Sequence, residues 1–129
     1  MIGLGRMAKA ILLPLLETNV FSANEVFAVV GKKSSVESAL KDLTPGVNVV
    51  SSDDPHSSEV WNSNVKILAV KPQQLEGVKL PPKDFLLSTQ PSKGLLISLL
   101  AGVTLSRLQQ SFPGIPCARA VPNLPVLVG

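Results

Sequence analysis

Short apolar runs alternate along this chain with segments of helical periodicity. The apolar runs are rich in Val, Ile and Leu, which is typical of parallel strands buried on both faces. Strands are predicted at residues 26–30, 47–50, 65–70, 95–99 and 116–120. Helices are predicted over residues 6–18, 34–43 and 105–112, with a short helix near Val60 and a Pro-rich loop over 77–83. This alternation predicts βαβ units around a parallel sheet.

Two local signals refine the predicted helices. Ser34 and Glu37 have the spacing of a capping box, which predicts a helix start at Ser34. Pro14 falls inside the first helix and predicts a kink or a break there. The order of elements predicts an α/β fold of the Rossmann type, a doubly wound, mostly parallel sheet with helices on both faces.

A glycine motif stands almost at the first residue, in the segment Ile2-Gly3-Leu4-Gly5-Arg6-Met7-Ala8. In a G-x-G-x-x-A turn the first glycine makes the tight turn and the second lets the backbone approach a pyrophosphate. The small Ala8 then lets the helix pack close to the strand. Met1 and Ile2 alone precede the turn, so the first strand is expected to be a stub. By itself the motif fits a plain loop equally well.

Composition narrows the class of protein. With 129 residues and 45% hydrophobic residues, the chain is expected to form one globular domain. No apolar run reaches the roughly 18 residues of a membrane span, and Glu17 ends the one run that could pass for a signal-peptide core. The lone cysteine, Cys117, predicts no internal disulfide and a reducing, cytoplasmic location.

The charge and the polar residue types point to a small anionic ligand. The net charge of +3 is mild and does not demand nucleic acid, and aromatic residues make up 4% with no Tyr. One His and one Cys cannot build a metal site, so no metal is predicted. His56 and Trp61 are interpreted as a loop residue and a packing residue.

Residues that follow the predicted strands are candidates for ligand contact, because such folds bind ligands there. Gly31-Lys32-Lys33-Ser34 has no carboxylate for ribose hydroxyls, and its ammonium and hydroxyl groups suit a 2′-phosphate. The alternative is a solvated charge pair at a turn. Pro72 is expected to end a strand, either at the ligand edge or as a simple strand terminator. Ala101 and Gly102 would allow close approach of a flat ring, and a packing role fits them equally well. Asn123 is expected in a rigid turn between prolines.

Four segments together resemble pyrroline-5-carboxylate reductases. They are Gly3 to Ala8, Leu68-Ala69-Val70-Lys71-Pro72-Gln73, Ser98 with Ala101-Gly102-Val103-Thr104, and Arg119 with Pro122, Asn123 and Pro125. The resemblance covers essentially the whole chain. It implies reduction of the cyclic imine 1-pyrroline-5-carboxylate to proline with NADPH or NADH. Lys32, Lys33 and Ser34, with no carboxylate beside them, predict that NADPH is preferred and NADH possible. An N-terminal Rossmann domain would bind the dinucleotide, and a following helical domain would dimerise and hold the substrate.

The resemblance also implies the residues of the cofactor site, with no catalytic residue among them. Around the pyrophosphate it places Ile2, Gly3, Leu4, Gly5, Arg6 and Met7. At the 2′-phosphate it places Lys32, Lys33 and Ser34, and near the nicotinamide Ala69, Val70, Lys71, Pro72, Leu99, Leu100 and Ala101. Asn123 would lie near the nicotinamide and the substrate entrance.

The chain departs from the family pattern next to Asn123. Val121 stands where the family has Met and Leu124 where it has Thr, which removes a hydroxyl near the ring. Residues 1–129 are expected to be a dinucleotide-binding domain truncated at its first strand and lacking the C-terminal substrate and dimerisation domain. The isolated chain is therefore expected to be inactive. The alternatives are a non-catalytic dinucleotide-binding module and a related Rossmann reductase with another substrate.

Overall fold

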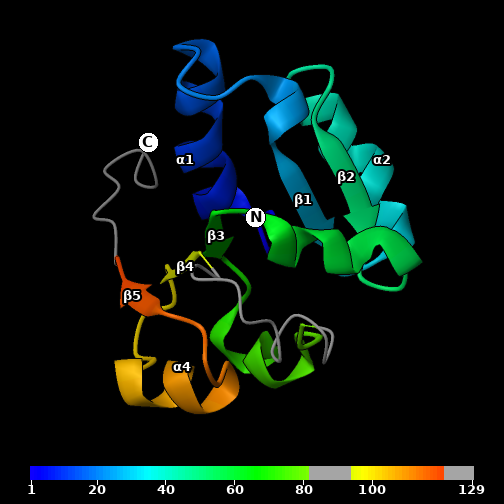
Figure 1. Ribbon diagram of the computed structural model, residues 1–129. Helices are drawn as coiled ribbons and strands as arrows, with labels where there is room; N and C mark the ends of the chain where they lie inside the picture. The colour runs from blue at the N-terminus through cyan, green and yellow to red at the C-terminus, as the bar shows by residue number, and fades with distance from the viewer. Residues whose placement is uncertain (82–93, 121–129) are drawn as a thin grey trace.

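The computed structural model describes residues 1–81 and 94–120, and Asn123 lies outside these ranges (Figure 1). Five strands, three α-helices and three short 3-10 helices occupy the described residues. The strands are β1 (Phe27–Val30), β2 (Asn48–Ser51), β3 (Val65–Leu68), β4 (Leu95–Ser98) and β5 (Cys117–Arg119). The helices are α1 (Arg6–Glu17), α2 (Lys33–Asp42) and α4 (Leu105–Ser111), with η1 (Ala23–Glu25), η2 (Pro55–Asn62) and η3 (Pro72–Gly77). All five predicted strands are confirmed, whereas η3 was not predicted.

Two parallel sheets are joined through the first residues of the chain. β1 pairs with β2, and β4 pairs with β3 on one side and β5 on the other, all in parallel. Ile2 forms parallel bridges with both Val29 and Leu68. Its N–H donates to the carbonyl of Ile67 at 2.7 Å, and its carbonyl accepts from the N–H of Ala69 at 2.8 Å. The strand order is therefore β2-β1-Ile2-β3-β4-β5, with the predicted stub in the central position.

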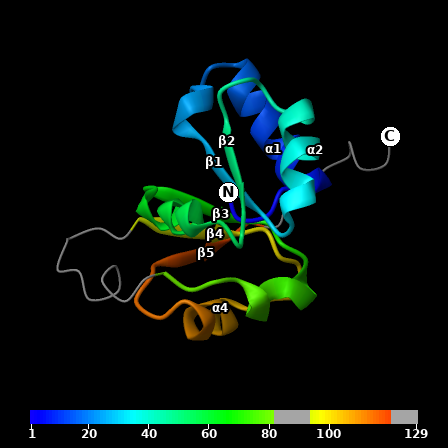
Figure 2. The same cartoon turned by 90° about the vertical axis from the view of Figure 1, so that its right-hand side faces the viewer.

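Helices cover both faces of this twisted arrangement, which confirms the doubly wound fold (Figure 2). One core cluster lies under α1 and consists of Met1, Ala8, Leu12, Leu16, Ala28, Leu43 and Val47. The other lies under α4, η2 and η3 and consists of Ile2, Val60, Trp61, Leu68, Leu75, Leu96, Leu100, Val103, Leu108, Phe112 and Ile115. Trp61 packs there against Phe112 with ring centroids 5.7 Å apart, which confirms its packing role.

Helix α1 runs unbroken through Pro14, so the predicted break is wrong. Ala8, Leu12 and Leu16 recur every four residues and form the buried stripe of the helix. Pro14 lies on the exposed side, where water can bond the carbonyl that loses its intrahelical partner. Burial of the opposite stripe therefore holds the helix together across the proline.

Helix α2 begins one residue earlier than predicted, and the predicted capping box is wrong. Lys32 is the N-cap residue, and no side chain of the described residues caps the helix start. Ser34 lies inside the first turn instead. A side-chain cap stabilises a helix by only about 1 kcal/mol. Because β1 ends at Val30, only two residues turn the chain from the strand into the helix, which begins at Lys33.

Candidate functional site

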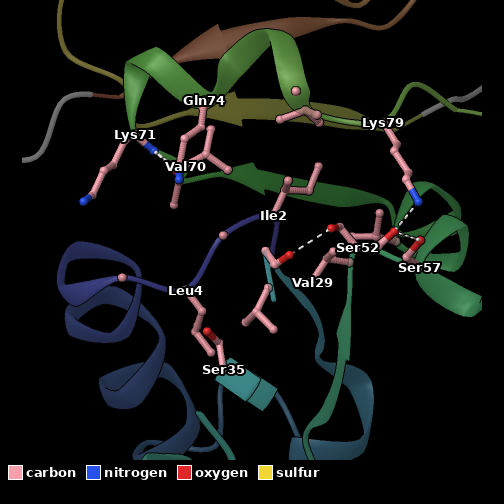
Figure 3. Close-up of a pocket in the computed structure, with 18 of the residues that line it drawn as sticks. Ile2, Leu4, Val29, Ser35, Ser52, Ser57, Val70, Lys71, Gln74 and Lys79 are labelled. Carbon is pink, nitrogen blue, oxygen red and sulfur yellow. Dashed lines mark hydrogen bonds between the residues drawn. The ribbon is translucent and has the colours of Figure 1, made fainter. Parts of the chain in front are cut away.

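A cleft of about 720 Å³ opens beside the glycine turn and the carboxyl ends of β1, β2 and β3 (Figure 3). The segments that line it come from the turn, from α2, from the loops after the strands and from η2 and η3. They are residues 2–5, 29–31, 69–71 and 77–80, with Lys9, Ser35, Ser38, Ala39, Ser52, Ser57, Ser58, Val60, Trp61, Gln73 and Gln74. This is the edge at which doubly wound sheets bind ligands.

Gly3 is required by the fold itself. Its φ of +89° lies in the left-handed region that side chains rarely adopt. A Cβ atom here would stand 2.8 Å from the carbonyl oxygen of Ala69 and 2.9 Å from the backbone nitrogen of Val70. The tight turn predicted at Gly3 is present, and the turn can approach the end of β3 only because residue 3 is glycine.

Gly5 is open toward the cleft. It is the N-cap of α1, with an extended backbone (φ −84°, ψ −167°) that any residue can adopt. Apart from its chain neighbours Leu4 and Arg6, no described residue has a heavy atom within 4 Å of the position of its Cβ. The first N–H groups of a helix have no partner within it and carry the positive end of its dipole. The bare backbone at Gly5 thus leaves an anion free access to this helix start.

The lining charges are positive. Lys9, Lys71 and Lys79 line the cleft, and no Asp or Glu is among the described lining residues. Lys9 is paired with Asp42, with Nζ 2.7 Å from the carboxylate oxygen. The backbone N–H of Lys71 donates to Oε1 of Gln74 at 3.0 Å, which fixes the exit from β3. The cleft is therefore suited to an anionic ligand.

The structure brings seven of the predicted site residues to the cleft: Ile2, Gly3, Leu4, Gly5, Ala69, Val70 and Lys71. Nine others do not line it, namely Arg6, Met7, Lys32, Lys33, Ser34, Pro72, Leu99, Leu100 and Ala101. Lys32 to Ser34 lie in the chain between Gly31 and Ser35, and both of these flanking residues line the cleft. Leu99 and Leu100 are buried, and Leu100 belongs to the core cluster under α4.

Sequence reasoning missed a polar wall of the cleft. Its hydroxyl groups belong to Ser35 and Ser38 of α2, Ser52 after β2, and Ser57 and Ser58 of η2. Ser52 directly follows β2, and in such folds the residues after the strands contact ligands, so this position could have been predicted from the sequence. Ser35 and Ser38 carried no such signal, because their side of α2 becomes a wall only in the folded chain.

The remaining titratable candidates do not form a catalytic group. His56 is exposed, with Nδ1 3.6 Å from a carboxylate oxygen of Glu59. Burial raises the pKa of the Cys117 thiol, so the thiol form is favoured. Over residues 1–81 and 94–120 no three His, Cys, Asp or Glu side chains gather as metal ligands. In the same ranges no helix is long and apolar enough to cross a membrane.

A family model described as NADP oxidoreductase, coenzyme F420-dependent, matches residues 1–102. The chain belongs to this family. Its membership agrees with the glycine turn and the open helix start, both of which lie within the matched residues.

Similar proteins confirm the resemblance that the motifs indicated. The chain is 37% identical to a pyrroline-5-carboxylate reductase of Synechocystis sp. over 129 residues, covering 99% of this chain and 44% of the relative. A pyrroline-5-carboxylate reductase of Pasteurella multocida is 35% identical over 131 residues, again covering 44% of that protein. The solved structure of a pyrroline-5-carboxylate reductase from Coxiella burnetii matches 98% of this chain and 44% of its own, with a TM-score of 0.75 and 29% identity. The chain thus spans less than half the length of these relatives.

Proposed function

We propose that this chain is the dinucleotide-binding part of a pyrroline-5-carboxylate reductase, which reduces 1-pyrroline-5-carboxylate to proline with NADPH. The observation that carries the proposal is the open helix start at Gly5, in a cleft lined by lysines and by no described carboxylate. The similarity of nearly the whole chain to pyrroline-5-carboxylate reductases supports it.

The residues present fit a dinucleotide. The space above Gly5 would admit a pyrophosphate, and the N–H groups of Arg6 and Met7 in the first turn of α1 would donate to it. Ile2 and Leu4 would flank it. When bound, the dinucleotide supplies a hydride to the imine carbon. The chain itself orients the cofactor and excludes water.

The nicotinamide end of the site is proposed at the exits of β3 and β4. Ala69, Val70 and Lys71 line the cleft, and Pro72 starts η3 directly after them. Leu99, Leu100 and Ala101 follow β4, the neighbour of β3 in the sheet, and Asn123 would complete this side. Buried Leu99 and Leu100 would give the ring an apolar floor.

NADPH is the proposed preference, with NADH as the weaker alternative. Lys32, Lys33 and Ser34 follow β1, where an NAD-specific fold places a carboxylate for the ribose hydroxyls. Two ammonium groups and a hydroxyl would instead bind the 2′-phosphate.

The substrate pocket and the homo-oligomer interface are proposed to lie in sequence corresponding to the part of the relatives that this chain does not match. The enzyme would work in the reducing cytoplasm, in keeping with its single cysteine. This proposal assigns cofactor binding to residues 1–129 and the holding of the imine to the other part.

Calorimetric titration of the chain with NADPH and with NADH tests the cofactor role. The expected result is saturable binding of both dinucleotides at one site, with NADPH the tighter ligand. A matched titration with flavin mononucleotide should show no binding at that site. If neither NADPH nor NADH binds, the proposed function is wrong.

A further inference from the structure

A network of hydrogen bonds centred on Ser52 occupies one end of the cleft (Figure 3). The carbonyl of Ser52 accepts from Nζ of Lys79 at 2.5 Å and from the hydroxyl of Ser57 at 3.3 Å. The hydroxyl of Ser52 donates to the carbonyl of Gly31 at 3.2 Å. Ser52 is therefore hydrogen-bonded to both Lys79 and Gly31, and Gly31 directly precedes Lys32 in the chain.

This network lies at the place where the fold would receive a ribose. Gly31 follows β1 and Ser52 follows β2, and these strands are parallel neighbours whose carboxyl ends meet. In dinucleotide folds the residue that recognises the adenosine ribose follows the strand equivalent to β1. Lys79 comes from the loop after η3, on the other side of the cleft, and its side chain extends toward Ser52 and Ser57 (Figure 3).

The ammonium group of Lys79 is available for a stronger partner. Its side chain is 61% exposed, and Asp53, which is 88% exposed, holds a carboxylate oxygen 4.0 Å from Nζ. Such exposed pairs stabilise by about 0–1 kcal/mol. Asp54, the other nearby acid, accepts from the N–H of His56 at 2.8 Å at the start of η2. A phosphate monoester carries a charge of about −1.5 to −2 at neutral pH, so it would compete well with a single exposed carboxylate.

We propose that Lys79 is a specificity-determining residue that binds the 2′-phosphate of NADPH from the side of the cleft opposite the loop after β1. This inference rests on the proposed function. The ammonium would exchange its contact with Asp53 for the phosphate. The phosphate would then be held between the loop after β1 and the loop after η3.

Isothermal titration of the wild-type chain, Lys79→Ala and Lys79→Arg tests this role. The ligands are NADPH, NADH, 2′,5′-ADP and 5′-AMP, of which the first and third carry the 2′-phosphate. Lys79→Ala should weaken NADPH and 2′,5′-ADP about 5- to 10-fold, the loss of a partly exposed charged contact. NADH and 5′-AMP should change less than about twofold, because they lack the group that Lys79 contacts.

Two variants serve as controls. Lys79→Arg keeps the charge and should retain most of the preference for 2′-phosphate ligands. Lys41→Ala removes an exposed lysine near the end of α2, outside the cleft lining, and should leave the ratio of NADPH to NADH affinity unchanged. The loss in Lys79→Ala should shrink as the salt concentration rises, because exposed charges are screened.

The outcomes separate this inference from the proposed function. If the wild-type chain prefers NADPH and Lys79→Ala keeps that preference, the role of Lys79 is wrong and the proposed function stands. An equal loss for all four ligands, or an equal loss in Lys79→Arg, also contradicts a charge contact with the 2′-phosphate. If the wild-type chain binds no dinucleotide, the proposed function fails and this inference fails with it.

Discussion

Replacement of Gly5 by valine separates the fold from the ligand site. The backbone of Gly5 is extended, and apart from its chain neighbours no described residue has a heavy atom within 4 Å of its Cβ position, so a side chain here meets no clash at Cβ in the free protein. Valine is a poorer N-cap residue than glycine, which should lower the free energy of unfolding by about 1 kcal/mol. The same side chain would occupy the space in front of the helix start where the pyrophosphate is proposed to lie.

The expected loss of binding is much larger than this loss of stability. A hydrogen bond to a charged group contributes about 1.5–3 kcal/mol. If valine keeps the pyrophosphate from two N–H groups of the first turn of α1, the loss is about 3–6 kcal/mol. Because each 1.4 kcal/mol is a tenfold change, affinity for NADPH should fall by at least about 100-fold.

Calorimetry with NADPH and urea denaturation of the same samples measure both quantities. Gly3→Ala is the matched control, since its Cβ would meet the carbonyl of Ala69 at 2.8 Å with φ at +89°, and it should destabilise the fold itself. Gly5→Val should stay folded and lose the ligand. Binding by Gly5→Val at nearly wild-type strength would refute the placement of the pyrophosphate on this turn.

Two further predictions concern charge. Replacing both Lys32 and Lys33 by alanine should weaken NADPH by about 1–3 kcal/mol and NADH far less in calorimetric titrations, and equal losses would contradict their assignment to the 2′-phosphate. Burial lowers the pKa of Lys66 in β3 from its ordinary 10.5, so the unfolded chain holds this proton at a pH where the folded chain has lost it. The contribution of Lys66 to the free energy of unfolding should therefore increase as the pH rises toward 10.5. In urea denaturation at several pH values, Lys66→Met should show a smaller rise than the wild-type chain. Burial raises the pKa of Cys117, which gives the free energy of unfolding an opposite dependence on pH, but this effect is the same in the wild-type chain and in Lys66→Met and cancels in their difference. Identical pH dependence of the free energy of unfolding in the two proteins would contradict the burial effect at Lys66.

The sequence was sufficient for features governed by local sterics and periodicity. The tight turn at Gly3, where φ is +89°, follows from the glycine motif. The apolar runs identified every strand of the described residues because parallel strands buried on both faces leave an uninterrupted signal.

Features decided by tertiary packing could not be predicted in the same way. Lys79 lies 27 residues from Ser52, in a Pro-rich segment without periodicity, and the fold alone brings them together. The capping signal at Ser34 was outweighed because such a signal is worth about 1 kcal/mol and the strand before it already fixed the helix start. Leu100 is predicted near the nicotinamide, and its place in the core cluster under α4 could not be read from the sequence.

We propose that residues 1–129 supply the cofactor half of a pyrroline-5-carboxylate reductase. The most direct measurement is NADPH oxidation with 1-pyrroline-5-carboxylate by a chimera in which this chain replaces the matched segment of the Synechocystis relative. We expect turnover by the chimera and none by the 129-residue chain alone, because catalysis requires the imine to be held within about 3–3.5 Å of the hydride. A folded chimera that binds NADPH but leaves the substrate unreduced, or robust turnover by the short chain, would contradict this proposal.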